Sequence, residues 1–114
     1  MAVGGERQWA IEFSDEVRDW LAGLDIRGLA TAQRHIDRLA ALGPHLPMPW
    51  SRPLGDGLLE LRLTVERKEQ RITYYVDPER LIITLTTFRK QRQNERREIE
   101  RARRVRTRRM QERK

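Results

Sequence analysis

Three segments with the character of β-strands follow one another in the stretch LLELRLTVERKEQRITYYVDPERLIITLTTF, residues 58–88. Strands are expected over residues 58–65, 71–76 and 81–88, which are rich in Leu, Ile, Val, Tyr and Thr. The links between them are short and polar, and short links join antiparallel neighbours. The stretch therefore predicts an antiparallel meander.

Alternation along these strands sorts their side chains onto two faces. In the first strand one set is wholly apolar, and the opposite set contains Glu60 and Arg62. In the second strand the set opposite the apolar one contains Arg71 and Tyr75. We therefore expect these four side chains on one face of the sheet, away from the core.

The residues before the meander predict one more strand and two helices. Residues 9–13 alternate apolar and polar side chains, as a strand with one buried face does. Ser14 is a suitable N-cap for a short amphipathic helix, and a second helix is expected after a break near Gly28. This second helix is expected to stop at Gly43.

Two further segments complete the chain. Four prolines in residues 43–53 exclude a helix interior and a central strand, so we expect a stiff irregular loop pinned by Trp50. Residues 94–114 contain no Gly or Pro and predict a basic helix. Because its apolar residues are few, we expect it to dock by one or two turns and to be otherwise solvated or frayed.

Together these elements predict an α+β fold in which two N-terminal helices pack on one face of a small, mostly antiparallel four-stranded sheet. The other face is expected to be open. A single domain is expected over residues 1–114, with residues 1–7 as a disordered arm, because a chain this short buries only one core.

Composition limits the classes of protein that are possible. The sequence has no cysteine, no long apolar run and no signal-peptide pattern, so we expect a soluble, cytoplasmic protein that does not act at a membrane. Residues 89–114 carry 13 basic and 4 acidic side chains, which concentrates the positive charge at the C-terminal end. Such a segment favours a polyanionic partner such as a nucleic acid.

The expected outer face brings cations together from neighbouring strands. Arg62 and Arg71 lie on two adjacent strands, and further cations follow at the end of the third strand: Arg89, Lys90 and Arg92. Guanidinium groups bind phosphate oxygens in pairs, so this convergence suits a phosphate. The alternative is a set of ordinary surface ion pairs, Arg62 with Glu60 or Glu69 and Arg71 with Glu66 or Asp77.

Three motifs in this order resemble a known group of proteins. They are PLGDGLLELR (residues 53–62), QRITYYV (residues 70–76) and LTTFRKQRQNERREIERARR (residues 85–104). The chain resembles the RelE/ParE toxin superfamily, and most closely its phage-derived, HigB-like branch, over about residues 8–104.

The resemblance implies a RelE-like fold and the toxin of a type II toxin–antitoxin system. Such a toxin cleaves mRNA in the ribosomal A site, which inhibits translation and arrests growth. The implied partners are the ribosome, mRNA and a helix-turn-helix, HigA-like antitoxin. The implied reaction is attack of the ribose 2′-hydroxyl on the adjacent phosphorus, which needs no metal or other cofactor.

Candidate site residues follow from the face assignment and the resemblance together. Arg62 and Arg71 are assigned to phosphate stabilisation, Lys90 to proton donation, and Glu60 is the candidate base. The residues assigned to RNA binding are Arg89, Arg92, Tyr75, Arg96 and Arg97.

The chain departs from the family pattern, because Leu58 and Glu60 stand where RelE-like members place lysines. A histidine used by some HigB members is also missing, so the general base stays unassigned. His35 is expected on the surface of the second helix, whereas His45 reaches the site only if the proline-rich loop folds over the sheet. Trp50 is expected to anchor that loop rather than to stack on a base.

Two other functions fit the same pattern. A ParE-like, non-enzymatic inhibitor of DNA gyrase shares the fold, because a fold does not fix a function. A non-catalytic RNA-binding module would use the same cations only to hold phosphate. The basic C-terminal helix, for its part, suits contact with ribosomal RNA, cover by an acidic antitoxin segment, or a solvated tail.

Overall fold

The computed structural model describes residues 8–112, and the expected arm over residues 1–7 lies outside them. The elements, in chain order, are β1 (Ala10–Glu12), α1 (Asp15–Ala22), α2 (Ile26–Leu42), the short 3-10 helix η2 (Gly43–His45), β2 (Ser51–Gly55), β3 (Leu58–Val65), β4 (Lys68–Asp77), β5 (Leu81–Arg89) and α3 (Glu95–Glu112).

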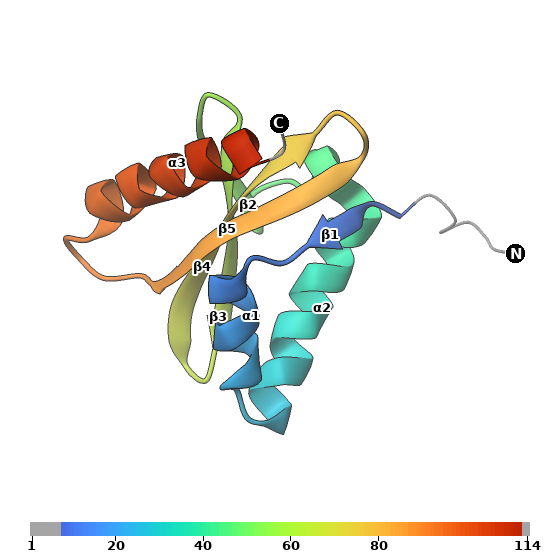
Figure 1. Ribbon diagram of the computed structural model, residues 1–114. Helices are drawn as coiled ribbons and strands as arrows, with labels where there is room; N and C mark the ends of the chain where they lie inside the picture. Colours follow the sequence, from blue (N-terminus) through green and yellow to red (C-terminus); the bar gives the residue numbers. More distant parts are fainter. Residues whose placement is uncertain (1–7, 113–114) are drawn as a thin grey trace, which may run out of the picture.

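The sheet confirms the predicted α+β class and the meander. Its strands lie in the order β1-β5-β4-β3-β2, and β1 pairs with β5 in parallel while all other pairs are antiparallel. Figure 1 shows α1 and α2 on one side of this sheet and α3 across the other.

The sheet has five strands rather than the four predicted. The additional strand, β2, lies in the segment where the prolines predicted an irregular loop. β2 is an edge strand, and Pro53 is tolerated there because one side of an edge strand makes no ladder hydrogen bonds. The pairing with β3 shifts register between Pro53 and Gly55, which ends the strand.

The layer formed by α1 and α2 covers the first core. Ser14 caps α1 as predicted, because its Oγ accepts a hydrogen bond from the Val17 N–H. The break between the helices comes at Gly23 and Asp25, not at Gly28. Gly28 lies in the first turn of α2, where a Cβ would lie only 3.3 Å from a methyl carbon of Val65, so its small size lets α2 approach β3 closely.

The opposite face of the sheet is not open as predicted, because α3 packs over part of it. Ala102 is 0% exposed, and Ile99 and Val105 lie beside it against the sheet. Beneath them lies a second apolar cluster of Leu58, Tyr75, Ile83 and Leu85. The outward alternation was predicted correctly, but Tyr75 belongs to this second core rather than to an open face.

Hydrogen bonds and ion pairs from arginines hold α3 in place. Arg103 and Arg106 donate to backbone carbonyl oxygens of Leu54 and Asp56 at 2.8 and 2.7 Å. Two further arginines form two-pronged ion pairs with acidic residues at the start of the chain: Arg101 with Glu16 and Arg109 with Glu12. The C-terminal helix is therefore docked along its length rather than solvated or frayed.

The contacts with α3 change the pKa of the Glu16 carboxyl group. Its partial burial alone would raise its pKa, but hydrogen bonds from Arg101 and from the Thr87 N–H outweigh burial and lower the pKa below its ordinary value. The interaction with Glu16 in turn raises the pKa of Arg101.

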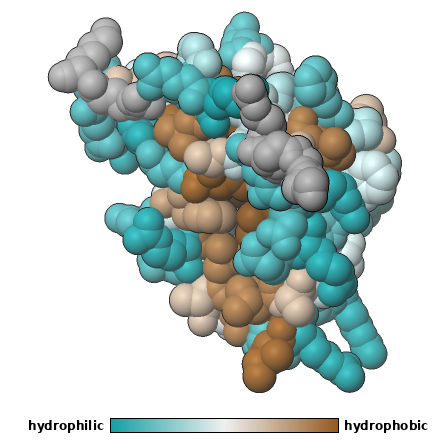
Figure 2. Space-filling view, turned by 90° about the vertical axis from the view of Figure 1, so that its right-hand side faces the viewer, coloured by the Kyte–Doolittle hydropathy of each residue, from teal (hydrophilic) through white to brown (hydrophobic). Residues whose placement is uncertain are grey.

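The side of the molecule that carries α2 has apolar residues on its surface. Figure 2 shows a strip of apolar surface running between hydrophilic groups on the side that carries α2. Exposed apolar residues on α2 are Ile26, Leu29 and Leu42. Within residues 8–112, the helices are all too short or too polar to cross a membrane.

Replacing Ala102 by Asp tests whether α3 is part of the fold. Ala102→Asp places a carboxyl group against Leu58 and Tyr75, so the free energy of unfolding should fall by at least about 2 kcal/mol. Urea denaturation measures the change. Arg104→Asp, at an exposed position of the same helix, shares the loss of helix propensity and should have a much smaller effect. Equal effects of both substitutions would contradict a docked α3.

Candidate functional site

The part of the sheet face beyond α3 holds two arginines side by side. Arg62 on β3 and Arg71 on β4 are direct cross-strand partners, so two guanidinium groups extend from the same face at neighbouring positions. Like charges placed opposite one another destabilise a sheet unless an anion offsets them. The pairing of these strands therefore favours a negatively charged group next to the two arginines.

A buried carboxylate, that of Glu60, offsets part of this positive charge. Glu60, two residues before Arg62 on β3, is 2% exposed. Its Oε2 lies 3.6 Å from Arg71 Nε, 3.9 Å from Arg62 Nε and 4.0 Å from an Nη of Arg52. These distances are longer than hydrogen bonds, and Arg71 Nε is buried without any hydrogen-bond partner.

Burial dominates the ionisation of this carboxylate. Loss of solvent raises the pKa of Glu60, and the attraction of Arg71, Arg52 and Arg62 only partly reverses the shift. The carboxylate of Glu95 pushes the pKa of Glu60 further upward. Glu60 thus holds a proton more readily than an ordinary glutamate.

Several more exposed charged residues lie beside the buried Glu60 and Arg71. The carboxylate of Glu69, which is 64% exposed, accepts a hydrogen bond from Arg71 Nη2 at 3.1 Å. Glu95 accepts one from Arg52 at 2.9 Å and lies 3.6 Å from Lys90 Nζ. We call this group the charge cluster: Arg52, Glu60, Arg62, Glu69, Arg71, Lys90 and Glu95.

A pocket opens directly beside the charge cluster. Its volume is about 330 Å³, and its walls include His35 from α2, Trp50 from the loop before β2, and Arg62 and Arg71 from the sheet. β2 pairs with β3 only as far as Leu61, so the edge of β3 beyond Arg62 has no strand paired with it. The chain turns away there, with the Trp50 carbonyl oxygen accepting a hydrogen bond from the Arg62 N–H at 2.8 Å.

The structure brings together four of the predicted site residues: Glu60, Arg62, Arg71 and Lys90. The pairing of Arg62 with Glu60 was one of the predicted surface ion pairs. Arg71, however, pairs with Glu69 and Glu60 rather than with Glu66 or Asp77. Because Glu60 and Arg71 are buried, this is not a set of ordinary surface pairs.

The residues predicted to bind RNA are placed differently. Tyr75 is 6% exposed and packs beneath α3, so it is not an open stacking surface, contrary to the prediction. The other four are exposed where β5 ends and α3 begins: Arg89, Arg92, Arg96 and Arg97. The neighbouring Lys90 N–H donates to the Glu69 carbonyl oxygen, which places these cations next to the charge cluster.

His35 is the pocket residue that sequence reasoning missed. It was expected on the surface, but it lies three residues after the buried Ala32 and four before the buried Leu39, at the margin of the apolar stripe of α2. That spacing was the signal available. Burial, then the charges of Arg38 and Arg34, lower the pKa of His35. His45 is exposed on η2.

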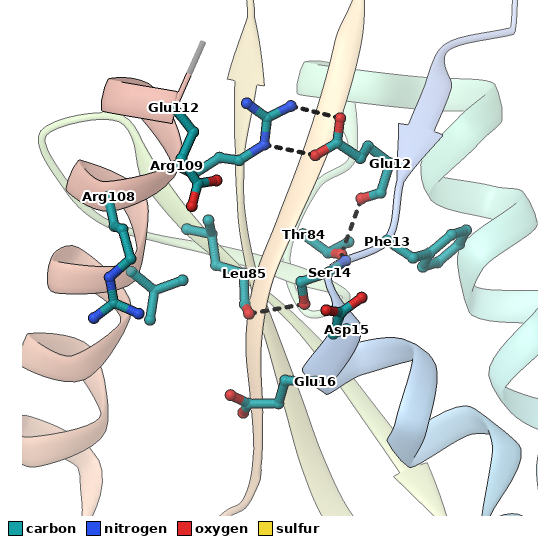
Figure 3. A pocket seen from close by; sticks show the side chains of 11 residues that line it. Glu12, Phe13, Ser14, Asp15, Glu16, Thr84, Leu85, Arg108, Arg109 and Glu112 are labelled. Atoms are coloured by element: carbon teal, nitrogen blue, oxygen red, sulfur yellow. Dashed lines mark hydrogen bonds and ion pairs between the residues drawn. The ribbon is translucent and has the colours of Figure 1, made fainter.

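A second pocket, of about 390 Å³, lies between the end of α3 and the β1–α1 connection. In Figure 3 the guanidinium of Arg109 faces the carboxylate of Glu12 across this gap, and Ser14 contacts the β5 backbone below it. Three of its charged residues, Glu12, Glu16 and Arg109, form ion pairs that dock α3. No group of three or more His, Cys, Asp or Glu side chains suited to a metal ion occurs within residues 8–112.

Comparison with known proteins places this fold. A chain of the crystallised toxin–antitoxin complex RelBE2 from Mycobacterium tuberculosis is similar with a TM-score of 0.53 at 20% sequence identity. The likeness covers 73% of this chain and 99% of that chain. No curated protein matches the sequence significantly. The fold is therefore the α+β fold of RelE-like proteins.

The sequence itself assigns the family. Residues 19–107 match the family described as phage derived protein Gp49-like (DUF891), which covers most of the chain from α1 into α3. The chain belongs to this family.

The charge cluster predicts a particular dependence of stability on pH. Because the pKa of Glu60 is higher in the folded chain, the folded state holds the proton more tightly and stability is lost as Glu60 ionises. The free energy of unfolding of the natural chain, minus that of Glu60→Gln, should therefore fall as pH rises from about 4 through the folded pKa.

Urea denaturation at a series of pH values measures this difference. Glu69→Gln removes one carboxylate from the exposed side of the same cluster and is the matched control. A difference between the natural chain and Glu60→Gln that grows with pH would mean that the arginines outweigh burial, which contradicts the raised pKa.

Proposed function

We propose that the protein is the toxin of a type II toxin–antitoxin system and cleaves mRNA in the ribosomal A site. The observation that supports this most is the cross-strand pair of Arg62 and Arg71, which lines an open pocket on a RelE-like sheet. The pair presents forked donors at one place, as a phosphodiester requires. The likeness to a chain of a toxin–antitoxin complex supports the same class.

The proposed reaction uses fixed positive charge. The ribose 2′-oxygen attacks the adjacent phosphorus, the bond to the 5′-oxygen breaks, and a 2′,3′-cyclic phosphate remains. Arg62 and Arg71 stabilise the charge on the phosphorane, which is the transition-state task of preorganised donors. The reaction proposed here needs no metal ion or organic cofactor.

Two groups of the charge cluster are proposed to move protons. Glu60 accepts the proton of the 2′-hydroxyl once the guanidinium groups turn to the phosphate, and its raised pKa brings it closer to the pH at which a base works best. Lys90, at the rim of the cluster, supplies a proton to the departing 5′-oxygen.

The partners follow from the same proposal. The exposed arginines where β5 ends and α3 begins, Arg89, Arg92, Arg96 and Arg97, contact RNA in the ribosome. A helix-turn-helix, HigA-like antitoxin holds the toxin inactive, and the toxin acts in the cytoplasm.

Cleavage of mRNA on programmed ribosomes tests the function. Primer extension should show cleavage in the A-site codon with ribosomes and none on free mRNA. Arg62→Gln and Arg71→Gln should each lower the single-turnover rate by about 100- to 1,000-fold, because each removes one preorganised donor. Circular dichroism confirms that each variant is folded.

Arg27→Gln is the matched control, because it removes an exposed arginine of α2 and should leave the rate unchanged. The half-exposed Arg62 keeps the test usable if the buried Arg71 variant does not fold. Absence of cleavage both on programmed ribosomes and on free mRNA rejects the proposal. If the same preparation inhibits the supercoiling of DNA by gyrase, that result favours the ParE-like alternative.

A further inference from the structure

The pocket beside the charge cluster combines two kinds of wall. The sheet contributes Arg62, Arg71 and Glu69 to its lining. Two residues with flat rings also line it: His35, and Trp50, which packs against the first core as well. Its volume of about 330 Å³ lies at the lower end of the range for small-ligand pockets. Cations beside flat rings suit a ligand that joins a phosphate to a planar base.

Arg38 fixes both rings of this pocket. Its guanidinium carbon lies 4.6 Å from the centroid of the Trp50 ring, a cation–π contact that sets the plane of the indole. An Nη of the same residue lies 3.4 Å from His35 Nδ1. The rings are thus held by a common support from α2, and a preorganised surface loses little entropy when a ligand binds.

The contact with Arg38 also determines what His35 offers a ligand. An arginine only donates hydrogen bonds, so His35 Nδ1 accepts, and the proton of the neutral ring resides on Nε2. The lowered pKa of His35 agrees with a neutral ring. The lining of the pocket therefore combines an indole, an imidazole that carries an N–H donor, and the exposed Thr64.

We propose that this pocket is a nucleobase slot of single-stranded RNA, in which a base stacks on Trp50 and accepts a hydrogen bond from His35. The base belongs to the nucleotide whose phosphate is bound by Arg62 and Arg71. The inference rests on the proposed function, which it deepens by assigning a base-recognition site. Stacking on an aromatic ring and hydrogen bonds to base edges are the usual means of reading unpaired RNA.

Binding of small ligands tests the slot apart from cleavage. The probes are the four nucleoside 3′-monophosphates and ribose 3-phosphate, which has the phosphate but no base. At least one nucleotide should bind the natural chain about 5- to 150-fold more tightly than ribose 3-phosphate, the range expected for stacking of one base. Nuclear magnetic resonance titration measures each dissociation constant.

Substitutions then show which side chains make the nucleotide bind more tightly than ribose 3-phosphate. Trp50→Leu should reduce the ratio to near one, Trp50→Phe should retain most of it, and His35→Leu should lower it. Trp20→Leu is the matched control, because Trp20 is a half-buried tryptophan of the first core that does not line this pocket. Arg62→Gln should weaken all ligands equally and leave the ratio unchanged.

The outcomes separate the slot from the proposed function. A ratio near one in the natural chain, or a ratio unaffected by both Trp50→Leu and His35→Leu, overturns the slot alone. Failure of ribose 3-phosphate and of every nucleotide to bind counts instead against the phosphate site. If Trp50→Leu does not fold, as circular dichroism would show, Trp50→Phe and His35→Leu decide the result.

Discussion

The register of β3 on β4 places two guanidinium groups opposite one another, and the carboxylates of the charge cluster offset their repulsion. Arg62 and Arg71 are direct partners, and Glu60 is buried beneath them although its burial disfavours the charged form. The geometry leaves Arg71 Nε without a hydrogen-bond partner. An arrangement of this kind suits an anion, which connects the packing of the sheet to the proposed chemistry.

The second constraint is the position of α3. Ala102 and its apolar neighbours cover the part of the sheet face built around Leu58 and Tyr75, while arginines of the same helix bind carbonyl oxygens and carboxylates at its margins. The basic helix thus has a structural role in addition to its charge. α3 contributes Glu95 to the charge cluster but no residue to the lining of the pocket between Trp50 and Arg71, which remains accessible.

Alternation along the strands was enough to place Glu60, Arg62 and Arg71 on one face, because a period of two fixes the face of each side chain. Periodicity predicted that α3 docks by one or two turns but not that it docks along its length, since arginine contacts with backbone oxygens leave no apolar pattern. The proline content hid β2, because local sequence does not say which strand will be at an edge. Likewise, the place of His35 in the pocket depends on a loop that passes near α2 only in the folded chain.

The measurement that tests the account most directly is a double-mutant cycle of Arg62→Gln and Arg71→Gln in single-turnover mRNA cleavage on programmed ribosomes. Two arginines that stabilise one phosphate and share one carboxylate should be coupled, so the double variant should lose much less than the product of the two single losses. Losses that multiply would show that the arginines act independently. That result would contradict a common phosphate site on this sheet.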